Sequence, residues 1–542
     1  MICRFFAIVA FAAGLFGLAV PANAEWYEAQ SDHFVIYADD SERDIRRFAE
    51  NLERYHSALA FLTRRQLEKP SPSNRVVIFV VGNQRDLRRV LDTDNRQIGG
   101  VYIPRAGSSR AYVQDIRNRS GYPHFSTVIL LHEYAHHFLI SSTRFAMPRW
   151  LSEGAAEFFS AASFNEDGSV IIGRAAQHRG PELAYGNPVS VEQLLDPEVY
   201  DSRRARRGDS FYGWSWLLYH YLTFNEERSG QLVQYQQNLM EGMRPRAAAD
   251  AAFGDLGQLE RELKAYFRGR FMTFVIPPER LTTGQISLRP LSAGEAEMMT
   301  VRMRSQRGVN SEQAAQLVIE AREIASRHPD DPGVQTALAE AEYDAGNDAA
   351  AIAAADAALA RDPARTNAYV QKGYALFRMA ADAPVPDAAY EAAMKPLTAL
   401  NQRENDHPIP LMYYYRSFAE RGVTPPENAR AALERAAQLA PFDQGLWLQV
   451  AVMQAGEGKI SLARQSLQPL AADPHGGGLS EMAAMLVNVL DQSSEGEPLR
   501  LALPERELSD DAGTEAVADA GSDESDRDAG SSGSEDAEAQ PD

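Results

Sequence analysis

The chain has 542 residues, of which 44% are hydrophobic, and a formal net charge of −21 at pH 7. A chain of this length is expected to form two or three domains, and its acidic excess argues against a nucleic-acid partner. Residues 508–542 hold 12 acids and one arginine, about half of the net charge, so the remaining chain is only mildly acidic.

The first 24 residues have the pattern of a secretory signal peptide. Arg4 gives a basic start, residues 5–20 are largely apolar, and Ala22-Asn-Ala24 offers the small residues of a cleavage site. The single cysteine, Cys3, lies within this segment and does not follow a lipidation box. We therefore expect a periplasmic or secreted mature chain without disulfides and, since no later apolar run is long enough, without a membrane span.

Residues 25–276 are predicted to form one domain of mixed α and β structure. The β-branched run at 75–81 indicates a buried strand, and helical apolar spacing at Ile45, Phe48 and Leu52 indicates a helix over 41–67. Further strands are expected at 33–37 and, as a hairpin, at 100–103 and 111–113. Further helices are expected at 126–140, 148–159, 210–224, 230–241 and 256–271.

The second half of the chain carries a repeat that is marked by proline. Five prolines recur at intervals of 33 or 34 residues, with one longer gap of 45: Pro329, Pro363, Pro408, Pro441 and Pro474. Helix–turn–helix units of this length, each closed by proline, resemble the tetratricopeptide repeat (TPR). The resemblance implies an all-α solenoid over 309–491, and other α-solenoid types stay open. Three adjacent tyrosines, 413–415, cannot all face one side of a helix, so at least one should face the groove or the N-terminal domain.

Two segments without repeats flank the predicted solenoid. Residues 277–308 are expected to be a connector with one strand near 285–288. After residue 491 the chain is rich in Ser, Gly, Asp and Glu and almost free of aromatic residues. This composition predicts an acidic disordered tail over 492–542.

The strongest chemical signal in the sequence is His132-Glu-Tyr-Ala-His136. Two histidines four apart on a helix lie about 40° apart around its axis and about 6 Å along it. Their rings can therefore meet at one ion while Glu133 faces the open side of that ion, the H-E-x-x-H pattern of zinc hydrolases with glutamate as general base. Glu153 follows with 16 residues intervening and supplies a third ligand, which leaves one position for water.

Residues 124–222 resemble the gluzincin metallopeptidases, the group that includes thermolysin and the aminopeptidase-N-like enzymes. The segment Trp150-Leu-Ser-Glu-Gly154 is similar to the W-L-x-E-G motif that carries the third zinc ligand there. The resemblance implies an α+β gluzincin-like metallopeptidase domain, followed here by the all-α, TPR-like helical-repeat solenoid. It also implies one Zn²⁺ per chain, with the ligands His132, His136 and Glu153.

The same resemblance implies roles for two further residues. Residues 212–222 are similar to the aminopeptidase helix that opens with a transition-state tyrosine, so Tyr212 is expected to donate to the oxyanion. Glu157 lies one turn beyond Glu153, where thermolysin-like enzymes place an acid that holds a zinc histidine, so it is expected to orient His132. Tyr212 as part of an aromatic core and Glu157 as a surface carboxylate remain alternatives.

These observations predict a periplasmic or secreted zinc metallopeptidase that cleaves peptides or proteins with Glu133 as general base. The aminopeptidases' G-x-M-x-N strand has no counterpart near 99–113, which favours an endopeptidase. The repeats are expected to recruit the substrate or a protein partner. The alternatives are an inactive peptidase-like TPR scaffold that binds a protein partner, and a zinc hydrolase acting on another amide or an ester.

Overall fold

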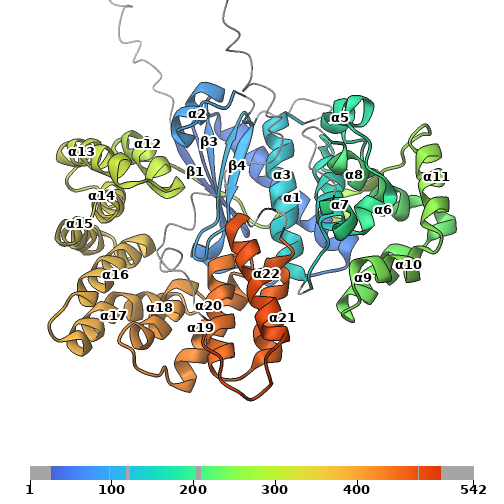
Figure 1. Ribbon diagram of the computed structural model, residues 1–542. Helices are drawn as coiled ribbons and strands as arrows, with labels where there is room; N and C mark the ends of the chain where they lie inside the picture. The colour runs from blue at the N-terminus through green and yellow to red at the C-terminus, as the bar shows by residue number, and fades with distance from the viewer. Residues whose placement is uncertain are drawn as a thin grey trace, which may run out of the picture.

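The computed structural model describes residues 26–96, 98–116, 123–143, 145–202, 209–473, 475 and 477–501. The predicted signal peptide, Pro474 and residues 502–542 of the predicted tail lie outside these residues. An α/β region comes first and paired helices follow (Figure 1). The predicted order of an α/β region and an all-helical repeat region is confirmed at this level.

A mixed six-stranded sheet forms the centre of the α/β region. Its strands lie in the order β4-β5-β3-β2-β1-β9, so β4 and β9 are its edges. β3 runs parallel to β2 and β5, and the remaining pairs are antiparallel. The strands are β1 (Tyr27–Gln30), β2 (Phe34–Ala38), β3 (Val76–Val81), β4 (Gly100–Ile103), β5 (Arg110–Gln114) and β9 (Ser287–Pro290).

Helices cover both faces of this sheet, which is why the central strand β3 is apolar along its whole length. Val76, Ile78 and Val80 of β3 share one core with α1 (Glu42–Thr63) and α3 (Phe125–Ser142). The alternate side chains Val77, Phe79 and Val81 pack with α2 (Gln84–Leu91) and α12 (Ala293–Arg307). The helix α3 that carries the H-E-x-x-H motif is therefore packed directly on the sheet.

The rest of the α/β region lies on the side of α3 away from the repeats' first helices (Figure 1). Its longest helices are α4 (Arg149–Ser160) and α8 (Phe211–Phe224), which pack against each other. A second, three-stranded sheet consists of β6 (Ser163–Phe164), β7 (Val170–Ile172) and β8 (Phe274–Ile276). The remaining helices are α5 (Gly180–Tyr185), α6 (Val191–Leu195), α7 (Pro197–Ser202), α9 (Gln231–Met240), α10 (Pro245–Phe253) and α11 (Leu256–Tyr266).

The interval 277–308, predicted as a connector, contains strand β9 and helix α12. β9 pairs with β1 in antiparallel register and so becomes the last strand of the large sheet. Met299 and Met303 of α12 are buried against the sheet, and the Tyr112 hydroxyl of β5 donates to the Met303 carbonyl at 2.9 Å. The start of the helical region is thus part of the packing of the α/β region.

The helical repeat region consists of helix pairs that follow α12. Its helices are α13 (Ser311–Arg327), α14 (Pro332–Asp344), α15 (Asp348–Arg361), α16 (Thr366–Ala381), α17 (Pro386–Arg403), α18 (Pro408–Ala419), α19 (Glu427–Leu439), α20 (Gln444–Gly456), α21 (Ile460–Ala471) and α22 (Gly477–Asp491). None of the helices in the described part of the chain is long and apolar enough to cross a membrane.

The prolines that mark the sequence repeat lie where one helix pair meets the next. Pro329, Pro363 and Pro441 fall between helices, and Pro408 begins α18, because proline cannot continue the preceding helix. The longer gap between Pro363 and Pro408 corresponds to longer helices. α16 and α17 have 16 and 18 residues, against 13 and 14 in α14 and α15.

The helix pairs form an arc that leaves the sheet at α12 and returns to the α/β region at α20–α22 (Figure 1). Asn74 donates to the Leu439 carbonyl at 2.7 Å, and the Ala106 amide donates to Asp443 at 2.8 Å. The rings of His137 on α3 and Phe442 lie 4.4 Å apart. The repeat region is therefore attached to the α/β region at α12 and again along its later helices, from the contact of Ser73 with Glu404 onward.

A chamber of about 2710 Å³ lies between the concave side of the arc and the α/β region. Tyr374 and Tyr413 line it, with their rings stacked at 5.0 Å. Tyr413 is the most buried of the three adjacent tyrosines at 413–415. The Tyr414 hydroxyl instead accepts a hydrogen bond from the Asn428 side-chain amide at 3.0 Å. Glu133 and His136 of the motif also line this chamber, so the expected groove and the expected site face the same space.

The packing of α12 on the sheet predicts a large loss of stability when its buried methionines are shortened. Met299→Ala or Met303→Ala should lower the stability of the α/β region by about 2–5 kcal/mol, the usual range for emptying a core methionine site. Denaturant titration followed by tryptophan fluorescence measures this. Met485→Ala is the control, since Met485 is 62% exposed on α22, and equal losses in all three variants would contradict the docking of α12.

Candidate metal centre

Helix α3 supplies two histidines from consecutive turns. His132 and His136 are both buried, at 4% and 7% exposure, and their Nε2 atoms lie 3.1 Å apart. Most of the helix is apolar because it lies between the sheet and other helices, so the two histidines are surrounded mainly by protein atoms. Its first turn is capped by the His124 side chain, which accepts a hydrogen bond from the Ser126 amide.

Helix α4 supplies Glu153, whose side chain is completely buried. Its Oε2 atom lies 3.4 Å from His132 Nε2 and 3.5 Å from His136 Nε2. The neighbouring Gly154 allows α8 to approach closely, since a Cβ at that position would lie 2.5 Å from the Ser215 carbonyl oxygen. The three sequence-predicted metal ligands are thus brought together by the packing of α3, α4 and α8.

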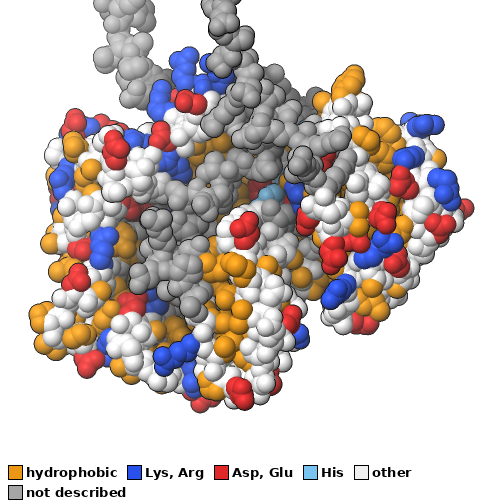
Figure 2. Space-filling model, in the orientation of Figure 1, with side chains coloured by type: hydrophobic (Ala, Val, Ile, Leu, Met, Phe, Trp, Pro, Cys, Tyr) orange, Lys and Arg blue, Asp and Glu red, His pale blue; other side chains and the backbone are white. Residues whose placement is uncertain are grey.

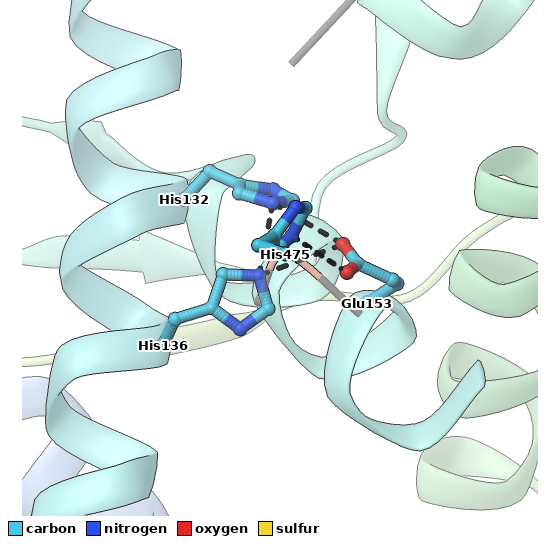
Figure 3. Close-up of side chains that lie close together, drawn as sticks. All are labelled: His132, His136, Glu153 and His475. Carbon is cyan, nitrogen blue, oxygen red and sulfur yellow. Dashed lines mark hydrogen bonds and ion pairs between the residues drawn. The ribbon is translucent and has the colours of Figure 1, made fainter. Parts of the chain in front are cut away.

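A fourth group, His475, reaches the same point from the repeat region. It lies between α21 and α22, and its Nε2 atom is 2.8 Å from Glu153 Oε1. One ligand atom from each of His132, His136, Glu153 and His475 lies within 4.8 Å of the others, and Figure 3 shows the four side chains converging. The sequence prediction missed His475, because it stands alone in a loop far along the chain from the motif.

The four residues fit a metal ion. Ligands about 2.0–2.1 Å from a tetrahedral ion lie about 3.3 Å from one another. The Nε2 atoms of His132 and His136 and the Oε2 atom of Glu153 are separated by 3.1–3.5 Å, and all four groups offer ligand atoms within 4.8 Å of one another. Although His475 comes close, neither oxygen of the buried Glu153 carboxylate accepts a hydrogen bond of normal geometry. A buried carboxylate in this situation is costly, and a cation between the four groups would satisfy it.

The outer nitrogens of the two motif histidines are held by other side chains. His132 Nδ1 lies 3.3 Å from Glu157 Oε1, and His136 Nδ1 lies 3.2 Å from the Ser152 hydroxyl. Such partners orient an imidazole and leave its other nitrogen for a metal. Glu157 is therefore in contact with His132, and its role in orienting that histidine stays a prediction.

Glu157 is itself held by two residues that the sequence analysis did not assign to the site. Arg179 donates to its Oε1 at 2.8 and 2.6 Å, and His178 Nε2 lies 2.6 Å from its Oε2. Burial alone would raise the pKa of the Glu157 carboxyl, but the charges of Arg179 and His178 hold that pKa well below its usual range. Glu157 is thus kept as a carboxylate beside His132.

The buried carboxylates give the site a strong preference for positive charge. Burial by itself lowers the pKa of His132, yet Glu153 and Glu157 raise that pKa to about 10. Burial likewise opposes protonation of His475, whose pKa Glu153 raises to about 9. The same negative potential favours the binding of a divalent cation between these groups.

Of the two predicted catalytic residues, Glu133 lines the chamber and Tyr212 is not among the residues that line it. Glu133 is half-buried and lines the chamber together with His136 and His475. The Tyr212 hydroxyl accepts a hydrogen bond from Arg149 at 3.4 Å, and Arg179 lies over its ring at 4.6 Å. Tyr212 is therefore linked to Glu157 through Arg179, and its role as oxyanion donor stays a prediction.

No protein-family model matches the chain. No curated protein matches it either. Solved structures that resemble part of it include a thermophilic TPR protein from Thermus thermophilus and a MamA RS-1 ArsTM double mutant. The first is 16% identical, with a TM-score of 0.32, over 36% of this chain and 100% of that chain. The second is 15% identical, with a TM-score of 0.25, over 37% of this chain and 96% of that chain.

The geometry predicts that the protein binds one metal ion per chain, with zinc as the expected ion. Purified protein reconstituted with zinc and then desalted should retain one equivalent by elemental analysis, and His136→Ala should retain clearly less. His328→Ala is the control, because His328 lies in the repeat region and contacts Glu297 instead. Equal zinc contents in wild type and His136→Ala would contradict a site at this cluster.

The contact between Glu157 and His132 predicts an effect on metal affinity alone. Glu157→Gln should weaken zinc binding about 10- to 100-fold, the usual effect of removing a group that orients a ligand. Competition with a chelating dye measures the affinity, and circular dichroism checks the fold, since the variant leaves Arg179 without its carboxylate. Glu166→Gln, in an exposed turn, is the matched control. An unchanged affinity would mean that Glu157 only neutralises Arg179.

Proposed function

We propose that the protein is a periplasmic or secreted zinc-dependent metallopeptidase that acts as an endopeptidase. The observation that carries this proposal is the position of Glu133 beside the His132, His136 and Glu153 cluster, on the wall of a large chamber. A carboxylate next to a metal site, open to a space that admits substrate, is what hydrolysis by an activated water requires. The extracytoplasmic location rests on the signal peptide predicted for residues 1–24.

The donor set suits zinc, since imidazole and carboxylate are its usual ligands in hydrolases. When bound, zinc lowers the pKa of water and polarises the scissile carbonyl. Glu133 takes a proton from the attacking water on its carboxylate and delivers it to the departing amine nitrogen. In the predicted role of Tyr212, its hydroxyl would donate a hydrogen bond to the developing oxyanion. Glu157 keeps His132 in the orientation that metal binding needs.

Strand β4 supports a peptide as the substrate. It is an edge of the large sheet, with β5 as its one strand partner among the described residues. Its residues line the chamber together with Glu133. An extended peptide can pair with such an edge through its backbone, and this places the peptide alongside α3, against which β4 packs.

The chamber also supports a flexible substrate segment. It lies between the arc of helices and the sheet, and aromatic side chains such as Tyr374 and Tyr413 line the repeat side. An unfolded chain or a loop can enter this space, and the aromatic rings offer it apolar contacts. The repeat region then serves to recruit the substrate or a protein partner, as TPR-like solenoids do through their concave surfaces.

His475 favours a second candidate function. A zinc ion with four protein ligands is characteristic of structural sites, whereas catalytic sites keep one position open. If His475 remains a permanent ligand, the cluster only stabilises the contact between the α/β region and the repeats. The protein would then be an inactive scaffold that binds a protein partner through its repeat region.

Replacement of the general base separates the two functions. Zinc-loaded wild type should cleave casein, and Glu133→Gln should retain zinc and the fold but lower the rate about 10²- to 10⁴-fold, because proton transfer is lost. Glu166→Gln should cleave like wild type. Absence of cleavage in zinc-loaded wild type and in His475→Ala alike would reject the peptidase and leave the scaffold.

A further inference from the structure

The fourth side of the cluster is taken by a residue of the helical repeat region. His475 points its Nε2 atom at the same position as the other three residues (Figure 3). Its ring lies edge-on to that of His136, with the centroids 5.3 Å apart. A catalytic zinc with two histidines and one glutamate keeps this fourth position for water, so the described conformation offers a histidine where the reaction needs a water molecule.

His475 also lies on the side of the site that Glu133 faces. Both residues line the chamber, and the charge of Glu133 contributes to the raised pKa of His475, after the opposing effect of burial and the larger effect of Glu153. A water molecule activated by Glu133 would have to approach from this direction. The imidazole of His475 and the reacting water therefore compete for one place.

The backbone of His475 is anchored to the repeat region. Its amide donates to Asp473 Oδ1 at 2.9 Å, the Ser480 hydroxyl donates to the Asp473 carbonyl at 3.0 Å, and Gln444 binds the other Asp473 oxygen. These partners belong to α20 and α22 or to the loop itself. His475 therefore joins the α/β region through its side chain at the cluster.

The helices around His475 have a core of their own. Apolar residues of α20, α21 and α22 form a cluster that contains no residue of the α/β region, and the core around α3 and α4 contains none of theirs. Leu462, Met485 and Val489 are exposed, and Figure 2 shows apolar side chains gathered over this end of the arc. Leu446 and Val450 of α20 also belong to a further cluster, against which Ala106 and Ile140 of the α/β region pack. His475 is a member of none of these clusters, so its removal from the metal would leave them intact.

We propose that His475 is a fourth, displaceable ligand of the metal centre, which closes the site of a latent peptidase until the imidazole leaves the metal. The latency of the site rests on the proposed peptidase function. The coordination of the metal by His475 does not depend on that function. Because His475 belongs to the repeat region, a shift of the last helices of the solenoid would move this ligand toward or away from the metal. Binding of a substrate segment in the chamber, which both His475 and Tyr413 line, would compete with the closed form.

Cobalt substitution tests the coordination without any assay of hydrolysis. The visible absorption of Co²⁺-loaded wild type should change little when acetohydroxamate, a small metal-binding probe, is added. Co²⁺-loaded His475→Ala should differ in its starting spectrum and respond to acetohydroxamate, since one position is then held by water. His328→Ala should behave like wild type. A wild-type spectrum that responds to acetohydroxamate as strongly as that of His475→Ala would overturn the proposal.

Chemical rescue guards against a variant that is merely misfolded. Added imidazole should restore the wild-type spectrum of Co²⁺-loaded His475→Ala, because it supplies the missing ligand in the vacated place. A folded variant, as judged by circular dichroism, whose spectrum does not respond to imidazole would also speak against a fourth histidine ligand.

Hydrolysis then tests the consequence of the closed site. Suppose that His475 binds the metal in about 90–99% of the molecules. Loss of this ligand should then raise the rate of cleavage of a short peptide about 10- to 100-fold. Zinc-loaded His475→Ala should show this increase, and the double variant with Glu133→Gln should lose it. The predicted cobalt spectra without any hydrolysis would support the fourth ligand and reject the peptidase, whereas hydrolysis that is equal in wild type and His475→Ala would reject latency.

Discussion

The buried carboxylate of Glu153 is the constraint on which the rest of the structure depends. Its oxygens are sealed from solvent and accept no hydrogen bond of normal geometry, so only positive charge can offset the cost of its burial. Three imidazoles surround it, from α3 and from the far end of the repeat region. His132 and His136 of the α/β region face this carboxylate, and His475 adds a third imidazole from the repeat region.

Packing within the α/β region fixes the position of the Glu153 carboxylate relative to His132 and His136. Gly154 admits α8 against α4, the sheet holds α3, and Glu157 ties α4 to His132. Arg179 and His178 in turn keep Glu157 charged. Polar contacts therefore run from His132 to Glu157 and on to His178 and Arg179. Because all four residues are largely buried, we expect loss of any one of them to change the position or charge of the candidate metal ligands.

The repeat region contributes a residue to the candidate metal centre and also forms one wall of the chamber. It begins as a strand and a helix of the α/β region, β9 and α12, and it ends with His475 at the cluster. The chamber lies between these two attachments, and Glu133, His136 and His475 line it. In the proposed function, recruitment of a substrate and access to the metal centre would therefore both depend on the curvature of one solenoid.

Local patterns in the sequence determined the elements and most of the cluster. The β-branched run of β3, the spacing of His132 and His136, and the prolines between helix pairs act over one or two turns, where neighbouring residues decide the conformation. The tertiary structure alone decided that α12 packs on the sheet and that His475 reaches Glu153. The packing of α12 follows from the pairing of β9 with β1, a contact between segments about 260 residues apart. The position of His475 depends on small rotations summed over many helix pairs, and no short stretch of sequence records that sum.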